Sequence, residues 1–113
     1  MAMILIVDPD PATRSLLEVV CVRLGHRTMG AREWLDGDEP DVLLLEPASR
    51  PCLRLARGVR RRFPLLPILF VSIDGPTGES MQLQPIAHVM KPFRRSQLER
   101  ALEQALDRTT EVA

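Results

Sequence analysis

Hydrophobic residues are concentrated in four short runs, and each run stops abruptly at a polar residue. The runs cover residues 3–7, 42–45, 68–71 and 88–90. Short apolar runs between turn residues are typical of strands that are buried on both faces of a sheet. The pattern therefore predicts four buried strands, and it favours a fifth, less hydrophobic strand around residues 27–31.

The first strand is followed almost at once by the signals of a helix start. Asp10 is suited to the N-cap position, and Pro11 to the first position of a helix. We predict a helix over residues 11–24, closed by Gly25. Four apolar residues at helical spacing are predicted to form its buried stripe, namely Leu16, Leu17, Val20 and Leu24.

Helical patterns also follow the later strands. A second long helix is predicted over residues 52–63, with three residues facing the sheet: Leu55, Val59 and Phe63. The last helix is predicted to begin at Ser96, because Ser96 and Glu99 match a capping box, and to fray after Arg108. The segments 32–36 and 79–83 have room for only short helices.

Buried strands that alternate with helices imply a parallel sheet with helices on both faces. We predict one α/β domain over residues 1–113, with a core at about 3–108 and the flavodoxin-like strand order 2-1-3-4-5. Ligands bind at the carboxyl ends of such strands. Four polar residues are expected to gather there: Asp8, Glu46, Ser72 and Lys91. Lys91 is the only lysine, since the other fourteen of the fifteen basic residues are arginines.

Composition excludes several classes of protein. Fifteen basic and fifteen acidic residues cancel, so no bulk charge favours nucleic acid or a membrane. No apolar run approaches the roughly 20 residues of a membrane span, and no signal peptide is visible. Cys21 and Cys52 are too few for a disulfide framework. We therefore expect a cytoplasmic protein whose cysteines are inert.

The order of these segments resembles the receiver domain of bacterial response regulators, which act in two-component phosphorelay signalling. The matching segments are 4–8, 40–46, 67–72 and 89–93, and the Lys-Pro-Phe of the last one is the most specific. The resemblance spans nearly the whole chain. It implies the (βα)5 receiver fold, here with shortened regions around the second and fourth helices.

The resemblance also implies roles for residues at the strand ends. In that family, an acidic pair after the first strand and an Asp after the third hold Mg²⁺, and this Asp takes a phosphoryl group from a histidine kinase. Asp8 matches the first acid, Pro9 stands where the second belongs, and Glu46 stands at the phosphoacceptor position.

Three further residues match positions around the phosphoryl group. Ser72 and Lys91 match the hydroxyl and the lysine that contact it, and His88 takes the place of the aromatic residue that switches with the hydroxyl. The family usually has a cis peptide bond before the proline that matches Pro92, so we expect one here.

These departures argue against phosphorylation. Mg²⁺ requires near-octahedral oxygen ligation. Asp8 and Glu46, even with Asp10, could hold it only weakly, so we expect no cofactor. Glu46 also carries one more methylene than Asp and could reach Lys91 and Ser72 instead, imitating part of the phosphorylated state. We hypothesise an atypical pseudo-receiver that binds a protein partner without phosphorylation.

Structural roles remain open for the same residues. Asp8 could simply be an acid at a strand end that the dipole of the following helix stabilises. Glu46 and Lys91 could form a structural ion pair, and His88 could be a partly buried strand residue. A working receiver that is phosphorylated with Mg²⁺ is the main functional alternative. We expect no enzyme of another class, because no general base, nucleophile constellation or phosphate loop is visible.

Charge is unevenly placed along the chain. Six acids and no base occur in residues 33–46, whereas six arginines and no acid occur in residues 47–73. Three of them, Arg54, Arg57 and Arg61, share one face of the predicted helix and could bind an acidic partner or a phosphate backbone. We favour the interpretation that this face is simply solvated. We do not expect a nucleic-acid partner, because the sequence contains no recognisable DNA-binding motif. A homodimer remains open.

Overall fold

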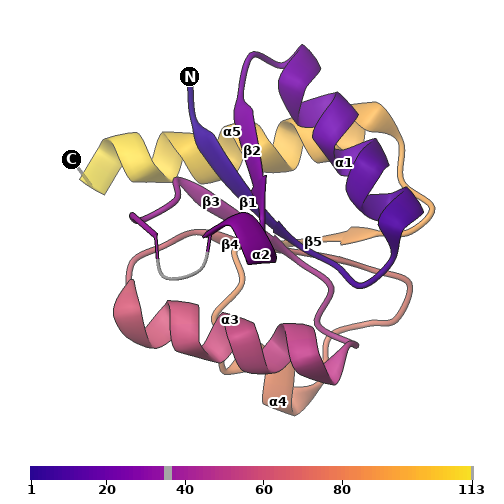
Figure 1. Cartoon of the computed structure of the whole chain (residues 1–113), viewed down its shortest axis with the longest axis vertical. Helices are drawn as coiled ribbons and strands as arrows, with labels where there is room; N and C mark the ends of the chain where they lie inside the picture. The colour runs from indigo at the N-terminus through magenta and orange to yellow at the C-terminus, as the bar shows by residue number, and fades with distance from the viewer. Residues whose placement is uncertain (35–36, 113) are drawn as a thin grey trace.

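The computed structural model describes residues 1–34 and 37–112, and their side chains as far as residue 107. Five strands form one parallel sheet in the order β2-β1-β3-β4-β5 (Figure 1). The strands are β1 (Met3–Val7), β2 (Arg27–Gly30), β3 (Val42–Leu45), β4 (Ile68–Ser72) and β5 (Ala87–Met90). The predicted fold class and strand order are thus confirmed.

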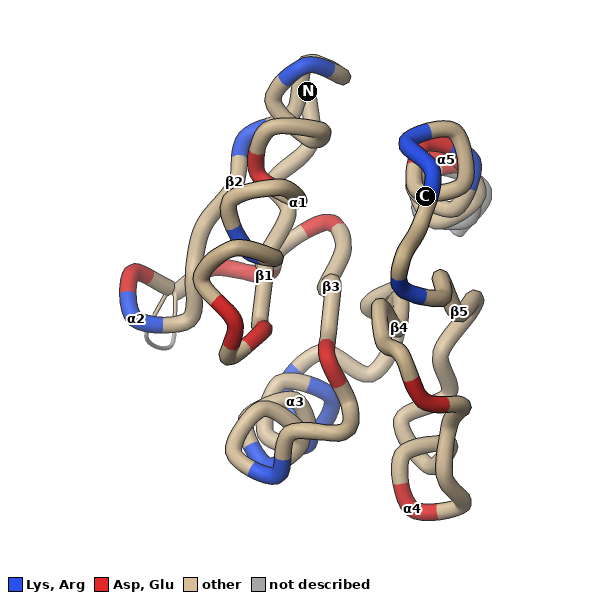
Figure 2. The backbone as a smooth tube through the Cα atoms, turned by 90° about the vertical axis from the view of Figure 1, so that its right-hand side faces the viewer, with Lys and Arg blue, Asp and Glu red and all other residues tan. Residues whose placement is uncertain are grey.

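Helices cover both faces of this sheet. The long helices are α1 (Pro11–Arg23), α3 (Arg50–Arg62) and α5 (Arg95–Val112), and the short ones are α2 (Ala31–Trp34) and α4 (Gly78–Met81). One core cluster lies between the sheet and α1 and α5, and a second lies between the sheet and α3. Figure 2, viewed at 90° to Figure 1, shows α5 and α3 on opposite sides of the strands β3 and β4. As predicted, α2 and α4 are short, with four residues each. Positions 35 and 36 of the predicted segment 32–36 lie outside the described residues.

The N-terminal end of α1 forms as its sequence predicts. The side chain of Asp10 accepts a hydrogen bond from the backbone N–H of Thr13, and Pro11 occupies the first turn. The predicted buried stripe is wrong at Leu16, whose exposed fraction is 51%. Leu17 and Val20 are buried as predicted, and Cys21 is buried beside them. Successive residues are about 100° apart around a helix, which turns Leu16 towards solvent.

The helix α3 differs from its prediction in both start and face. It begins at Arg50 rather than at residue 52, because Ser49 caps it and a proline is tolerated in the first turn. Of the three residues predicted to face the sheet only Val59 is buried, whereas Leu55 and Phe63 are partly buried. The buried stripe consists of Cys52, Leu53, Ala56 and Val59.

The predicted capping box of the last helix is also wrong. Helix α5 begins at Arg95, so Ser96 lies inside it. Gln97 Oε1 accepts the backbone N–H of Arg94 at 2.7 Å, and Glu99 pairs with Arg95 Nε at 2.7 Å. Local sequence spacing therefore matched a capping pattern that the tertiary fold did not use.

Arg60 ties the end of α3 to two neighbouring segments. Its guanidinium donates to the carbonyl of Leu83 at 3.0 and 2.8 Å, to that of Leu66 at 2.7 Å and to that of Pro64 at 2.9 Å. Burial lowers the pKa of Arg60, but an arginine side chain remains charged at neutral pH. The carbonyl oxygens therefore provide the acceptors that this half-buried cation requires.

Replacing Arg60 by methionine should lower the free energy of unfolding by at least about 2 kcal/mol, because several partly buried carbonyls lose a charged donor. Urea denaturation followed by circular dichroism measures the change. The neighbouring Arg61 is exposed, so Arg61→Met is the matched control and should stay within about 0.5 kcal/mol of the wild type. Equal effects of the two substitutions would show that the Arg60 hydrogen bonds contribute nothing specific.

Candidate functional site

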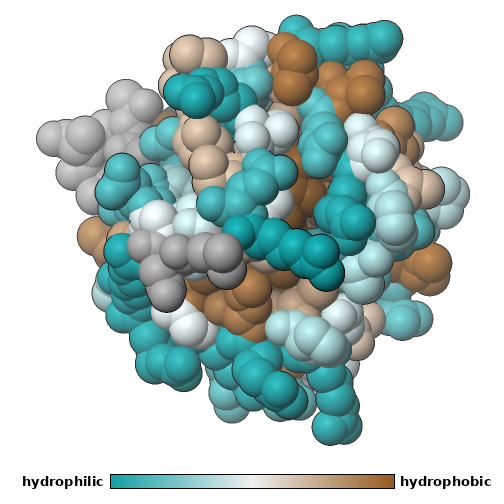
Figure 3. All heavy atoms as spheres, viewed as in Figure 1, coloured by the Kyte–Doolittle hydropathy of each residue, from teal (hydrophilic) through white to brown (hydrophobic). Residues whose placement is uncertain are grey.

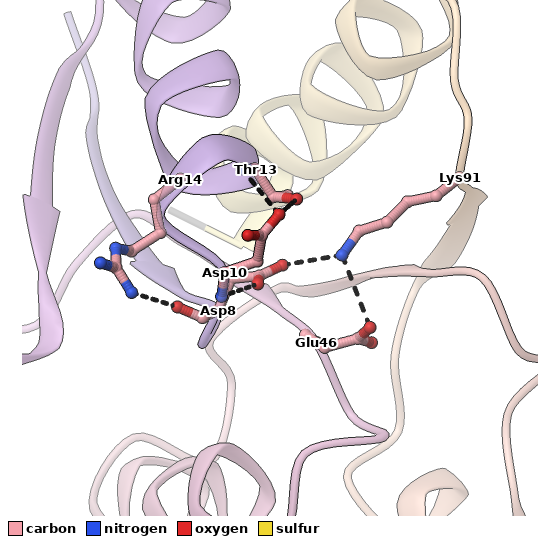
Figure 4. Close-up of polar contacts among 6 residues, drawn as sticks. All are labelled: Asp8, Asp10, Thr13, Arg14, Glu46 and Lys91. Atoms are coloured by element: carbon pink, nitrogen blue, oxygen red, sulfur yellow. Dashed lines mark hydrogen bonds and ion pairs between the residues drawn. The ribbon is translucent and has the colours of Figure 1, made fainter.

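Charged residues from three separate strands meet at the carboxyl edge of the sheet. Asp8 follows β1, Glu46 follows β3 and Lys91 follows β5. The Nζ atom of Lys91 lies 2.9 Å from Asp8 Oδ2 and 3.5 Å from Glu46 Oε1. Figure 4 shows the lysine extending from its strand end towards both carboxylates. We call Asp8, Glu46 and Lys91 the carboxylate–lysine cluster.

This cluster is shielded from solvent. The exposed fraction of the side chain is 2% for Asp8, 13% for Glu46 and 14% for Lys91. Ion pairs with so little solvent contact are screened far less than surface pairs. Lys91 therefore compensates two carboxylates that would otherwise be buried without a cation.

Asp8 is also held by the segment that leads into α1. Its Oδ1 atom accepts the backbone N–H of Asp10 at 2.8 Å, and its backbone carbonyl accepts Arg14 Nη1 at 2.8 Å. The side chain of Asp10 turns to Thr13, accepting from its backbone N–H at 3.1 Å and from its hydroxyl at 2.6 Å. The Thr13 hydroxyl holds the pKa of Asp10 below its usual value. Asp10 thus lies beside the cluster but serves as a helix cap.

Two buried polar atoms in the described part of the chain have no hydrogen-bond partner. They are Oε2 of Glu46 and Nε2 of His88. Buried polar atoms are usually paired. The sequence offered no signal for either atom, because each depends on how neighbouring segments pack around the strand ends.

The remaining predicted residues lie near the cluster without being tied to it by side-chain hydrogen bonds. Ser72 ends β4 and is buried, and its backbone carbonyl accepts the N–H of Lys91 at 3.0 Å. The ring of His88 packs edge-on against Phe70, with centroids 6.4 Å apart. The Lys91–Pro92 peptide bond is cis, the geometry that the resemblance implies.

The cluster is poorly suited to a Mg²⁺ ion. Among the side chains described, those of residues 1–34 and 37–107, no group of three or more His, Cys, Asp or Glu could hold a metal. The ammonium of Lys91 already lies close to both carboxylates, and Pro9 provides no side-chain oxygen. Mg²⁺ is usually held by one or two carboxylates plus waters, so at this cluster it would have to compete with the Lys91 ammonium for Asp8 and Glu46.

Both cysteines are buried and carry raised pKa values. Burial raises the pKa of the Cys21 thiol to about 11. Burial is also the largest cause that raises the pKa of Cys52. Thiols are nucleophilic only as thiolates, so neither residue has the environment of a reactive cysteine.

An exposed apolar surface lies along α1. Leu16, Val19 and Val22 are exposed by 51%, 46% and 59%. Figure 3 shows hydrophobic side chains at the surface on the side where Figure 1 places α1. The sequence pattern assigns Leu16 to the core and gives no signal for Val19 or Val22, so it does not reveal this surface.

The predicted basic patch is only partly free. Arg54 and Arg61 are exposed, whereas Arg57 forms an ion pair with Glu79 of α4. In the described residues no helix is both long enough and apolar enough to cross a membrane.

Comparisons with known proteins give structural matches alone. No family model and no curated protein matches the chain. The receiver domain protein (CheY-like) from Methanospirillum hungatei JF-1 superimposes with a TM-score of 0.87 at 18% identity, covering 100% of this chain and 99% of its own. The receiver domain of the sensor histidine kinase PA1611 from Pseudomonas aeruginosa PAO1, with a magnesium ion coordinated in its active site cleft, gives a TM-score of 0.77 at 19% identity, covering 94% of this chain and 98% of its own.

A third match is to part of a longer protein. NtrX from Brucella abortus, in complex with ADP, gives a TM-score of 0.82 at 24% identity. The match covers 98% of this chain but only 27% of the NtrX chain. At these identities the matches establish the architecture, and the chain has the CheY-like receiver fold.

Proposed function

We propose that this chain is a receiver-like module of two-component signalling that binds a protein partner without being phosphorylated. The observation that carries this proposal is the position of Lys91, whose Nζ atom contacts Asp8 Oδ2 at 2.9 Å and Glu46 Oε1 at 3.5 Å. In the receiver family, the lysine that Lys91 matches contacts the phosphoryl group. Here the side chain at the phosphoacceptor position already engages it.

Glu46 is suited to this substitute role by its length. It has one more methylene than aspartate, which extends the carboxylate by about 1.5 Å. A carboxylate carries less charge and fewer acceptor atoms than a phosphoryl group, so it imitates only part of the phosphorylated state. Pro9 supports the same conclusion, because it removes an acid that the family uses for Mg²⁺.

The proposed partner surface is the face formed by β5 and α5, which the resemblance implies. Hydrophobic side chains are exposed next to the strand ends that enter the site. Ile73 follows Ser72 and is 67% exposed, and Met90 precedes Lys91 and is 50% exposed. Both side chains are therefore available to a partner that binds beside the site.

Titration with Mg²⁺, with and without beryllofluoride, tests this proposal in the ¹⁵N-labelled wild type. Beryllofluoride mimics a phosphoryl group on a receiver acid. The amide signals of Asp8, Glu46, Ser72 and Lys91 should stay in place, because Pro9 supplies no ligand and Lys91 already pairs with both carboxylates. Concerted shifts of these amides, followed by His88, would overturn the proposal.

One observation favours a second function, that of a working receiver. Glu46 Oε2 is buried and unpartnered in the described residues, so one carboxylate oxygen is free of hydrogen bonds. Such a receiver would be labelled by a small phosphoryl donor in the presence of Mg²⁺, and Glu46→Gln would abolish the label. Absence of label in the wild type would exclude this alternative.

A further inference from the structure

The basic face of α3 is about one helical turn longer in the structure than the sequence predicts, because it also includes Arg50. Because the helix begins at Arg50, four arginines occur at positions i, i+4, i+7 and i+11: Arg50, Arg54, Arg57 and Arg61. At about 100° per residue these positions fall within a sector of roughly 60°. With a rise of about 1.5 Å per residue, they span roughly 16 Å of helix axis. We call these four residues the arginine stripe.

Three members of the arginine stripe are available to a ligand. Arg50, Arg54 and Arg61 are exposed, and within the described part of the chain their side chains form no hydrogen bond or ion pair. The fourth member, Arg57, pairs with Glu79, and this contact lowers the pKa of Glu79, with a smaller contribution from the charge of Arg50. Helix α3 itself contains no acid, as the absence of red along it in Figure 2 shows. Glu79 of α4 is therefore the acid that partly neutralises the stripe.

The chemistry of the stripe favours a polyanion over a protein surface. Protein interfaces usually have an apolar core with aromatic anchors. Every large hydrophobic side chain that is exposed in the described residues lies outside α3. The stripe also contains no aromatic ring on which an unpaired base could stack, as single-strand binders require. What remains is a straight row of planar guanidinium groups, which match phosphate oxygens bidentately.

We propose that the arginine stripe of α3 binds the phosphate backbone of duplex DNA without sequence preference, and that Glu79 limits this binding by holding Arg57. The proposal is independent of the carboxylate–lysine cluster, which lies at the carboxyl edge of the sheet. It also revises the expectation from the sequence, which favoured a solvated face before Arg50 was known to belong to the helix.

Fluorescence anisotropy with a labelled 20-base-pair duplex, titrated with the 113-residue chain at 25–200 mM salt, tests the proposal. Three free arginines should give a slope of log K against log salt of about −2.7, so affinity should fall by more than about 10²-fold between 25 and 200 mM salt. Two duplexes of unrelated sequence should bind equally. Absence of binding by the wild type at the lowest salt would overturn the proposal.

Two charge-changing variants and one matched control sharpen this test. Replacing Arg54 and Arg61 together by glutamine should reduce the slope by about 1.8 and weaken binding at 50 mM salt roughly 100-fold. Glu79→Gln frees Arg57 and should strengthen binding up to about tenfold. The control replaces Arg23 and Arg100 by glutamine, because both are exposed on other helices and the net charge is the same.

The control and a competitor define the results that contradict the proposal. If the Arg23 and Arg100 control weakens binding as much as the stripe variant, the effect is one of net charge, and no specific stripe exists. If a poly-glutamate peptide binds the stripe more tightly than the duplex does, the surface recognises acidic protein, and the nucleic-acid proposal is wrong. Circular dichroism establishes that each variant remains folded.

Discussion

Replacing Lys91 by methionine should lower the free energy of unfolding by about 3–5 kcal/mol, because it leaves two carboxylates buried without a cation. Asp8 and Glu46 expose only 2% and 13% of their side chains, so water cannot take the place of the ammonium. Methionine keeps much of the apolar volume of the lysine stem, so the loss reports mainly on charge. Urea denaturation measures it, and the slope of the transition shows whether unfolding stays two-state.

An exposed ion pair is the matched control for this substitution. Arg95 pairs with Glu99 at 2.7 Å, but 53% of the Arg95 side chain is exposed. Surface pairs at i, i+4 contribute about 0.3–0.5 kcal/mol, so Arg95→Met should have a correspondingly small effect. A Lys91→Met loss as small as this would show that the carboxylate–lysine cluster has no structural importance.

A double-mutant cycle measures the interaction between Asp8 and Lys91 separately from the other effects of each substitution. Asp8→Asn keeps an oxygen that can accept the backbone N–H of Asp10 but removes the charge that faces Lys91. Asp8→Asn combined with Lys91→Met should be less destabilising than the sum of the single substitutions, by about 0.5–3 kcal/mol. Strict additivity would contradict direct coupling between these two side chains.

Restoring the two acids that the receiver family uses should raise phosphorylation well above the level of the wild type. The variant combines Pro9→Asp with Glu46→Asp. Pro9 is exposed, so the first change should be tolerated, and the second shortens the carboxylate by about 1.5 Å and moves it away from Lys91. Since a misplacement of about 1 Å can cost about 10²-fold in a positioned reaction, labelling by ³²P-acetyl phosphate should rise by at least about 10²-fold over the wild type.

Two comparisons make this gain interpretable. Labelling of the double variant should require Mg²⁺. A second variant that combines Pro9→Asp with Glu46→Asn should not be labelled, because the amide cannot accept the phosphoryl group. Pro9→Asp alone, which leaves Glu46 in place, should label far less than the double variant. Strong labelling of the wild type would mean that Glu46 is a functional phosphoacceptor and that the proposed function is wrong.

The sheet follows from the sequence because its signals are local. Each buried strand is a run of apolar residues that ends on a polar one, and alternation with helical spacing leaves a parallel sheet as the arrangement that buries them all. The same logic predicted that Asp8, Glu46 and Lys91 would meet, since parallel strands carry their carboxyl ends to one edge. Asp10 and Pro11 predicted the start of α1 because capping involves only neighbouring residues.

Helix faces and helix starts were predicted less well, because packing against the sheet decides them. Leu16 fits a buried stripe by spacing, yet the docked helix turns it outward. Ser96 and Glu99 match a capping box, yet α5 begins at Arg95. Arg50 became part of the arginine stripe only when the structure showed Ser49 to be the N-cap.

The sequence by itself determined the fold class, the strand order and which side chains share the carboxyl edge, because hydrophobic periodicity and chain order carry that information. The tertiary structure alone decided how those side chains are used. Lys91 and Asp8 are 83 positions apart, and only the folded backbone brings their charged atoms to 2.9 Å. Likewise, only packing shows that Asp10 caps a helix, that Glu46 Oε2 is left without a partner, and that three arginines of α3 face solvent unpaired. Such outcomes depend on distances between segments remote in the chain, which no local pattern encodes.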